Sequence, residues 1–189
     1  MKCEHSELPE DKQRLKGRVV FLGDRVRDQY GIAAVFEALA STPAGMEASR
    51  FVDAYGLMTA DNGEEHICEQ ADAEQAYTQA PLDSPNKTWI RVPWHLRDDE
   101  MKKHPDVAYV MPLVKALYGH PQAGVFWERR MHAAVLSVGF TSLGNCGEWR
   151  SVYFHKEFQV LMIVYVDDFK LAGPPSGMEK RGQPFAKHR

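Results

Sequence analysis

The feature that most constrains this chain is an apolar run that ends in two adjacent carboxylates. Phe158 to Val164 is almost entirely apolar, and Tyr165, Val166, Asp167 and Asp168 follow it directly. Such a run predicts a strand that is buried in a sheet. Carboxylates at the tip of a buried strand are disfavoured unless their charge is neutralised. A divalent cation with hard oxygen ligands, such as Mg²⁺, would neutralise them, whereas read alone the Asp-Asp pair is equally well a turn signal.

Length and composition predict one globular domain with a real core. The chain has 189 residues, of which 44% are hydrophobic and 26% charged, and its net charge is −3. The charge is uneven, because basic residues dominate both the segment 12–27 and the end of the chain, 180–189. Such clusters are either phosphate-facing surfaces or ordinary solvated faces.

Cysteines and hydropathy bear on the compartment. The chain has 3 cysteines, far apart and without a Cys-x-x-Cys pair, which predicts neither a disulfide framework nor a zinc site. We therefore expect a reduced, intracellular setting. The longest uninterrupted apolar run, 160–166, is far too short to span a membrane, so no membrane partner is expected.

The patterning predicts an α+β fold with a mainly antiparallel sheet. Helices are expected where a proline at a first helical position precedes apolar residues at helical spacing. The expected helices are residues 43–58 and 121–139, and the expected strands are residues 18–22, 65–71, 88–93, 149–155, 158–165 and 169–173. Residues 94–106 read as a surface loop, and residues 1–13 and 174–189 as disordered tails, the second of them basic.

A second carboxylate follows another predicted strand. Asp72 ends the strand candidate 65–71, and two strand-end aspartates, Asp72 and Asp167, can meet across one sheet. Two metal ions held by shared carboxylates stabilise the attacking and leaving oxygens of a phosphoryl transfer. The basic residues Lys16 and Arg18 could then supply cations for a triphosphate.

Three motifs, in this order and at this spacing, resemble the reverse transcriptase of Ty1/copia-type LTR retrotransposons. They are Asp72-Ala-Glu-Gln-Ala-Tyr77, then Lys115-Ala-Leu-Tyr-Gly-His-Pro-Gln122-Ala-Gly-Val-Phe-Trp127, then Tyr165-Val-Asp-Asp168 with Leu171-Ala-Gly173. The resemblance covers roughly residues 14–173, which would be a fingers/palm domain with partial fingers. It implies a polymerase palm-like fold and RNA-directed DNA polymerase activity.

The resemblance also implies roles for individual residues. Asp72 and Asp167 would be catalytic and bind both metal ions, Mg²⁺ or alternatively Mn²⁺, with Asp168 as a supporting third ligand. Tyr77 would exclude a 2′-hydroxyl and so favour deoxynucleotides. Gln122 would contact the nascent base pair and the nucleotide.

Each of these nucleotide-binding roles has an alternative. Tyr77 could be a core aromatic, and Gln122 an exposed residue in the first turn of a helix. Lys16 and Arg18 resemble the basic finger residues that hold the triphosphate, but solvated surface is an equally good interpretation. The implied partners are an RNA or DNA template with its primer, and deoxynucleoside triphosphates. The implied location is a cytoplasmic particle or the nucleus.

The chain also departs from the family. Asp-Ala-Glu-Gln-Ala-Tyr-Thr-Gln differs from the commoner Asp-Val-Lys-Thr-Ala-Phe-Leu, and no thumb or RNase H follows Gly173, so a fragment of a Pol polyprotein is expected. Two alternatives remain. The first is a non-catalytic, decayed remnant with at most nucleic-acid binding. The second is an unrelated two-metal phosphodiesterase or nuclease, although His66 and His155 lack ligand spacing to the aspartates.

Overall fold

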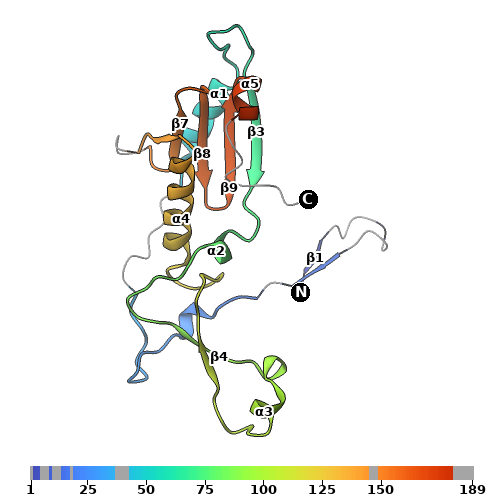
Figure 1. Ribbon diagram of the computed structural model, residues 1–189, viewed down its shortest axis with the longest axis vertical. Helices are drawn as coiled ribbons and strands as arrows, with labels where there is room; N and C mark the ends of the chain where they lie inside the picture. The colour runs from blue at the N-terminus through green and yellow to red at the C-terminus, as the bar shows by residue number, and fades with distance from the viewer. Residues whose placement is uncertain are drawn as a thin grey trace.

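The fold is α+β and is built around a mostly antiparallel sheet. The computed structural model describes residues 2–4, 9, 14–17, 19–36, 43–144 and 149–180. Within them, five strands pair antiparallel in the order β3-β9-β8-β7-β6 (Figure 1). Their bounds are β3 Ile67–Asp72, β6 Thr141–Ser142, β7 Val152–His155, β8 Val160–Tyr165 and β9 Asp168–Gly173.

The other described elements are short apart from two helices, α1 Met46–Tyr55 and α4 Ala123–Ser137. They are the strands β1 Lys2–Glu4, β2 Arg14–Lys16, β4 Trp89–Arg91 and β5 Val110–Pro112, the 3₁₀ turns η2 Gly23–Arg25 and η3 Trp94–Leu96, and the helices α2 Ala76–Gln79, α3 Asp99–Lys102 and α5 Pro175–Lys180. No described helix has the length and apolar character needed to cross a membrane.

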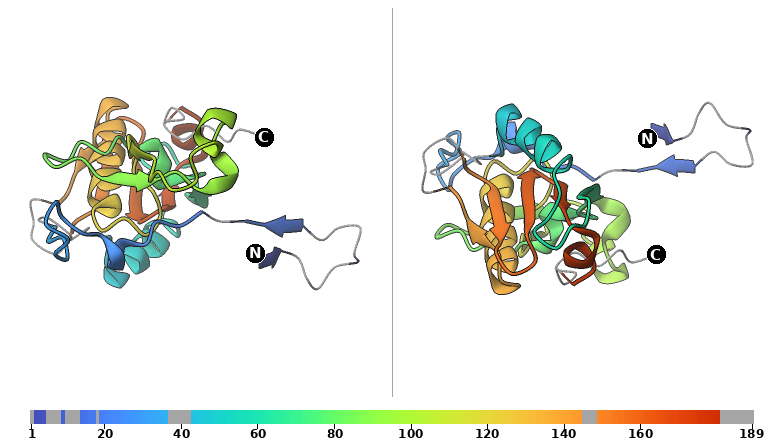
Figure 2. Two further views of the ribbon diagram at one scale, coloured as in Figure 1. Left: turned by 90° about the horizontal axis from the view of Figure 1, so that it is seen from below. Right: turned by 90° about the horizontal axis from the view of Figure 1, so that it is seen from above.

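Strand β8 is buried on both of its faces, because α1 and α4 cover opposite sides of the sheet (Figure 2). Val160, Met162 and Val164 pack in the cluster that contains α4, which we call the α4 face. Leu161 and Ile163 pack in the cluster that contains α1, the α1 face. Alternate residues of a strand point to opposite faces. Two covered faces therefore require the continuous apolar run that the sequence displays.

Several sequence predictions are confirmed with shifted bounds. The α+β class, the hairpin of β7 and β8 and the return strand β9 are all present. The predicted helix 43–58 is shorter in the structure, because α1 begins after its N-cap Gly45 and ends before its C-cap Gly56. A side chain at Gly56 would force Cys68 to shift, since a Cβ there would overlap Cys68 Sγ.

Other predictions are wrong. In the described part of the predicted strand 18–22, no strand forms. Phe21 N–H donates instead to Tyr118 O at 2.7 Å, and the chain then turns at η2. The expected surface loop 94–106 contains η3 and α3, and Asp98 caps α3 by accepting from Met101 N–H at 2.7 Å.

The two expected tails also differ from the structure where it describes them. Lys2–Glu4 pairs antiparallel with Arg14–Lys16. After Gly173 the chain continues into α5, and Met178 joins the core on the α4 face. The Pro-Pro-Ser-Gly sequence at the start of this segment is typical of a loop. The packing of Met178 in the core stabilises the helix there, because most helical stability in proteins comes from tertiary packing. Residues 181–189 lie outside the described residues.

Candidate active site

The turn between β8 and β9 carries two of the predicted site residues. Tyr165 pairs with Asp168, so Val166 and Asp167 form a two-residue hairpin loop. Val166 has φ 59°, which is unusual for a β-branched residue. Two-residue hairpin loops favour turns with φ > 0 at their first central position, because those turns match the twist of the strands. The connection is therefore a tight, strained turn that presents Asp167.

Two hydrogen bonds from other elements hold this turn. The indole N–H of Trp127, in α4, donates to Val166 O. Ala73 N–H, directly after β3, donates to Asp167 O at 2.8 Å. Trp127 is only 2% exposed. A buried indole N–H needs an acceptor. No role in the site was expected of Trp127, and the need of a buried indole N–H for an acceptor is the signal that could have indicated one.

Asp72 meets the turn across the sheet. It is the last residue of β3, and its cross-strand partner in the β3–β9 ladder is Asp168. Residues directly opposite in an antiparallel pair point to the same face, with Cβ atoms about 5 Å apart. The pKa of Asp168 is raised by its partial burial and then by the charges of Asp167 and Asp72. The structure thus brings the three predicted catalytic aspartates together at one end of the sheet.

Tyr77 lies beside these carboxylates. It sits in α2, close below the same end of the sheet (Figure 1). Burial raises the pKa of its hydroxyl, with further contributions from the charge of Asp167 and from Tyr118. The Tyr77 and Tyr118 rings meet edge to face, with centroids 4.6 Å apart. Tyr77 is half-buried, so it is both a packed aromatic and a neighbour of Asp167.

Gln122 lies at the start of α4, whereas Lys16 lies in β2. Gln122 is the N-cap residue of the helix whose Trp127 reaches the turn. Lys16 ends β2, whose hairpin with β1 extends away from the sheet (Figures 1 and 2). Arg18 lies outside the described residues. Of the two residues predicted to hold the triphosphate, only Lys16 falls on a described strand, and that strand lies away from the end of the sheet that carries the aspartates (Figure 1).

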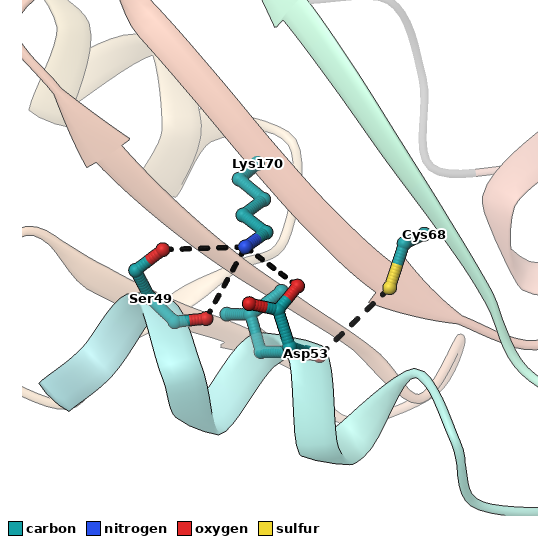
Figure 3. A network of polar contacts seen from close by, with 5 residues as sticks. Ser49, Asp53, Cys68 and Lys170 are labelled. Carbon is teal, nitrogen blue, oxygen red and sulfur yellow. Dashed lines mark hydrogen bonds and ion pairs between the residues drawn. The ribbon is translucent and has the colours of Figure 1, made fainter. Parts of the chain in front are cut away.

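An open hollow on the α1 face adjoins the carboxylates. It is lined by Asp72, Asp168 and Lys170 from the sheet and by Gly45 and Ser49 from the start of α1, among others. Lys170 is already engaged there. Its ammonium lies 2.6 Å from Asp53 Oδ1 and 3.2 Å from Ser49 Oγ (Figure 3). This lysine joins β9 to α1 and does not neutralise the aspartates.

Carboxylate oxygens are the donors that Mg²⁺ and Mn²⁺ prefer. Across the part of the chain that the structure describes, no group of three or more His, Cys, Asp or Glu residues is arranged to hold a metal ion. Mg²⁺ is usually held by only one or two carboxylates, with substrate phosphates and water completing its shell. The aspartates fit Mg²⁺ as a partial shell of this kind.

Comparisons of the chain with protein-family models, with curated proteins and with solved structures found no match.

Proposed function

We propose that this chain carries a nucleotidyl-transfer site of the RNA-directed DNA polymerase type, in a palm-like sheet resembling that of Ty1/copia-type retrotransposons. The substrates would be a primed RNA or DNA template and deoxynucleoside triphosphates. Asp72, Asp167 and Asp168 would hold Mg²⁺, which when bound supplies positive charge that stabilises the reacting phosphate oxygens. The proposal combines the motif resemblance with the geometry of the carboxylates.

The observation that supports it most is the cross-strand pairing of Asp72 with Asp168, with Asp167 in the adjoining turn. Like charges directly opposite in a sheet are destabilising. A structural turn gains nothing from carboxylates brought this near to one another, whereas a Mg²⁺ site uses one or two of them as ligands. The cost of this arrangement therefore favours a ligand-binding role over the simple turn interpretation.

The remaining residues would orient the nucleotide. Tyr77, close to Asp167 and packed on Tyr118, would set a wall beneath the incoming sugar and exclude a 2′-hydroxyl. Gln122 would meet the nascent base pair from the start of α4. Trp127 and Ala73 would keep Asp167 in position by holding the main chain of its turn. These contacts preorganise the site, which is how proteins accelerate a phosphoryl transfer that needs little covalent participation.

A second candidate is nucleic-acid binding without catalysis. It is favoured by the lack, among the described residues, of a complete group of metal-holding side chains, and by the position of β2, which carries Lys16, away from the five-stranded sheet (Figure 1). This alternative predicts that the chain binds primer-template equally well with and without its aspartates.

One experiment separates the two candidates. A poly(rA)/oligo(dT) primer-template with dTTP and Mg²⁺ should show addition of at least one nucleotide by the parent protein. Asp167→Asn should abolish the addition, whereas Asp106→Asn, a change of an exposed aspartate far from the site in sequence, should not. Filter binding of the same primer-template reports binding separately. Binding without any addition by the parent would overturn the polymerase proposal and leave the second candidate.

A further inference from the structure

His120 is a buried histidine in the turn that leads into α4. It is 4% exposed, and both of its ring nitrogens are engaged. Nδ1 accepts from Gln122 N–H at 3.2 Å, and Nε2 lies 3.0 Å from Thr88 Oγ1. The rings of Phe21 and Phe36 pack against it with centroids 5.1 and 5.3 Å away. This histidine therefore joins three segments that are far apart in the sequence.

These contacts determine the tautomer of His120. A main-chain N–H can only donate, so Nδ1 must accept and carry no proton. A neutral imidazole has one N–H, which must then be on Nε2 and donate to Thr88 Oγ1. A second proton could be added only at Nδ1, and it would abolish the bond to Gln122. The arrangement thus requires the neutral ring.

The surroundings of His120 favour that neutral form. Burial lowers the pKa of the imidazole from its ordinary value of 6.5. No charged group among the described residues contributes to this shift; the groups packed on the ring are the Phe21 and Phe36 side chains, the Thr88 hydroxyl and the Gln122 main chain. At neutral pH the acceptor for Gln122 N–H is therefore in place.

His120 performs the capping role that usually belongs to the N-cap side chain. A side chain at the N-cap position commonly accepts a hydrogen bond from a main-chain N–H of the first helical turn. Gln122 occupies that position in α4 and makes no such bond with its side chain. The main chain around it is held by His120 instead, through Nδ1 and through His120 O, which accepts from Ala123 N–H at 3.0 Å.

Gln122 is also linked to the carboxylate end of the sheet on two routes. Five residues further along the chain, in α4, the Trp127 indole N–H donates to the Val166 carbonyl. Four residues earlier, Tyr118 packs on Tyr77, which lies beside Asp167. A shift of the turn at His120 would therefore move Gln122 relative to the three aspartates.

We propose that His120 is a positioning residue for Gln122 and thereby for binding of the incoming nucleotide. This inference rests on the proposed function. It adds to the proposed site a residue that contacts none of the three aspartates. It also predicts a pH dependence of nucleotide binding that the aspartates do not explain. His120 acts by keeping the Gln122 main chain in place, so its loss weakens nucleotide binding more than the transfer step.

The test is the KM for dTTP and the kcat of single-nucleotide addition on poly(rA)/oligo(dT), measured from pH 8 to pH 5.5. His120→Met removes both hydrogen bonds and should raise KM about fivefold to tenfold, with kcat nearly unchanged. His120→Asn keeps an acceptor close to the Nδ1 position but cannot titrate. It should have nearly the parent KM at pH 8 and should lack the rise in KM that the parent shows below pH 6.5. His104→Asn, an exposed histidine, is the matched control and should behave as the parent.

The outcomes separate the two proposals. A parent protein that adds no nucleotide at any pH overturns the proposed function, and this inference with it. A parent that adds nucleotides while His120→Met keeps the parent KM overturns the inference alone. The inference alone is also overturned if the KM of His120→Asn for dTTP rises below pH 6.5 as much as that of the parent. Should His120→Met fail to fold in a thermal melt, the pH profile of His120→Asn decides.

Discussion

At the scale of single residues, the candidate site is a concentration of negative charge that the rest of the fold does not relieve. Asp168 faces Asp72 across the sheet and follows Asp167 in the chain, and no described lysine or arginine is ion-paired with any of the three. Lys170, two residues away, is engaged by Asp53 instead. Without a bound cation, these carboxylates therefore lower the stability of the protein.

The raised pKa of Asp168 gives this cost a definite pH dependence. A carboxyl whose pKa is higher in the folded state than in the unfolded state binds its proton more tightly when folded. Its contribution to stability is then fully present below the ordinary pKa of 3.8 and is lost as the pH rises through the raised value.

We therefore expect Asp168→Asn to be more stable than the parent at pH 7 without divalent metal, because a charge that is disfavoured by partial burial and by its neighbours Asp167 and Asp72 is gone. The difference should shrink as the pH falls through the raised pKa and should vanish well below 3.8, where Asp168 is protonated in both states. Thermal melts in EDTA across this pH range measure it. An Asp168→Asn protein that is less stable than the parent at pH 7 would contradict the expectation.

At the scale of elements, an ion pair fastens α1 to the sheet beside the hollow. The Lys170 side chain is 17% exposed and that of Asp53 58%, so the contact is only partly shielded from water. Lys103 and Glu100 in the surface segment form a pair of almost the same length, 2.7 Å against 2.6 Å, but with side chains 65% and 74% exposed. The two pairs therefore differ mainly in burial.

Burial should make the first pair the more important one. Asp53→Asn leaves the Lys170 ammonium with Ser49 alone. It should lower the free energy of unfolding by about 1 kcal/mol, because a partly buried charge then has no carboxylate partner. Glu100→Gln should lower the free energy of unfolding by at most about 0.5 kcal/mol, and in 1 M salt it should have no measurable effect. Urea unfolding of both variants at low and high salt provides the comparison. Equal costs would mean that Lys170 does not fasten α1 to β9.

At the scale of the whole molecule, a metal ion bound at the proposed site would couple metal binding to folding. Asp72 and Asp167 come together only when β3 pairs with β9, so the unfolded chain lacks the site. A ligand that binds only the folded state stabilises it by mass action, by about 1.4 kcal/mol at ten times its Kd.

We therefore expect Mg²⁺ to raise the melting temperature of the parent and of Asp106→Asn, but not that of Asp167→Asn. Melts with MgCl₂, compared with NaCl at equal ionic strength, measure the specific effect. Equal shifts in all three proteins would show that the aspartates form no metal site, and the simple turn interpretation of residues 165–168 would then hold.

Much of the sheet could be predicted from the sequence, because the information is local there. The run before Tyr165 has to be buried, a turn has to follow it, and the helical spacing of apolar residues after Pro121 predicts α4. The grouping of Asp72 with Asp167 also came from sequence, through strand ends and through motif resemblance.

Only the tertiary structure decided the contacts between distant segments. That β8 is covered on both faces depends on where α1 and α4 pack, which no local pattern specifies. The same holds for Trp127 at the Val166 carbonyl and for His120 between Thr88 and Gln122. Residues 18–22 read as a strand from their composition, yet in their described part Phe21 bonds the turn at Tyr118 and no strand forms. Local sequence determines which apolar face a segment can bury and which hydrogen bonds it can donate. Which residues cover that face or accept those bonds is determined only when the whole chain packs.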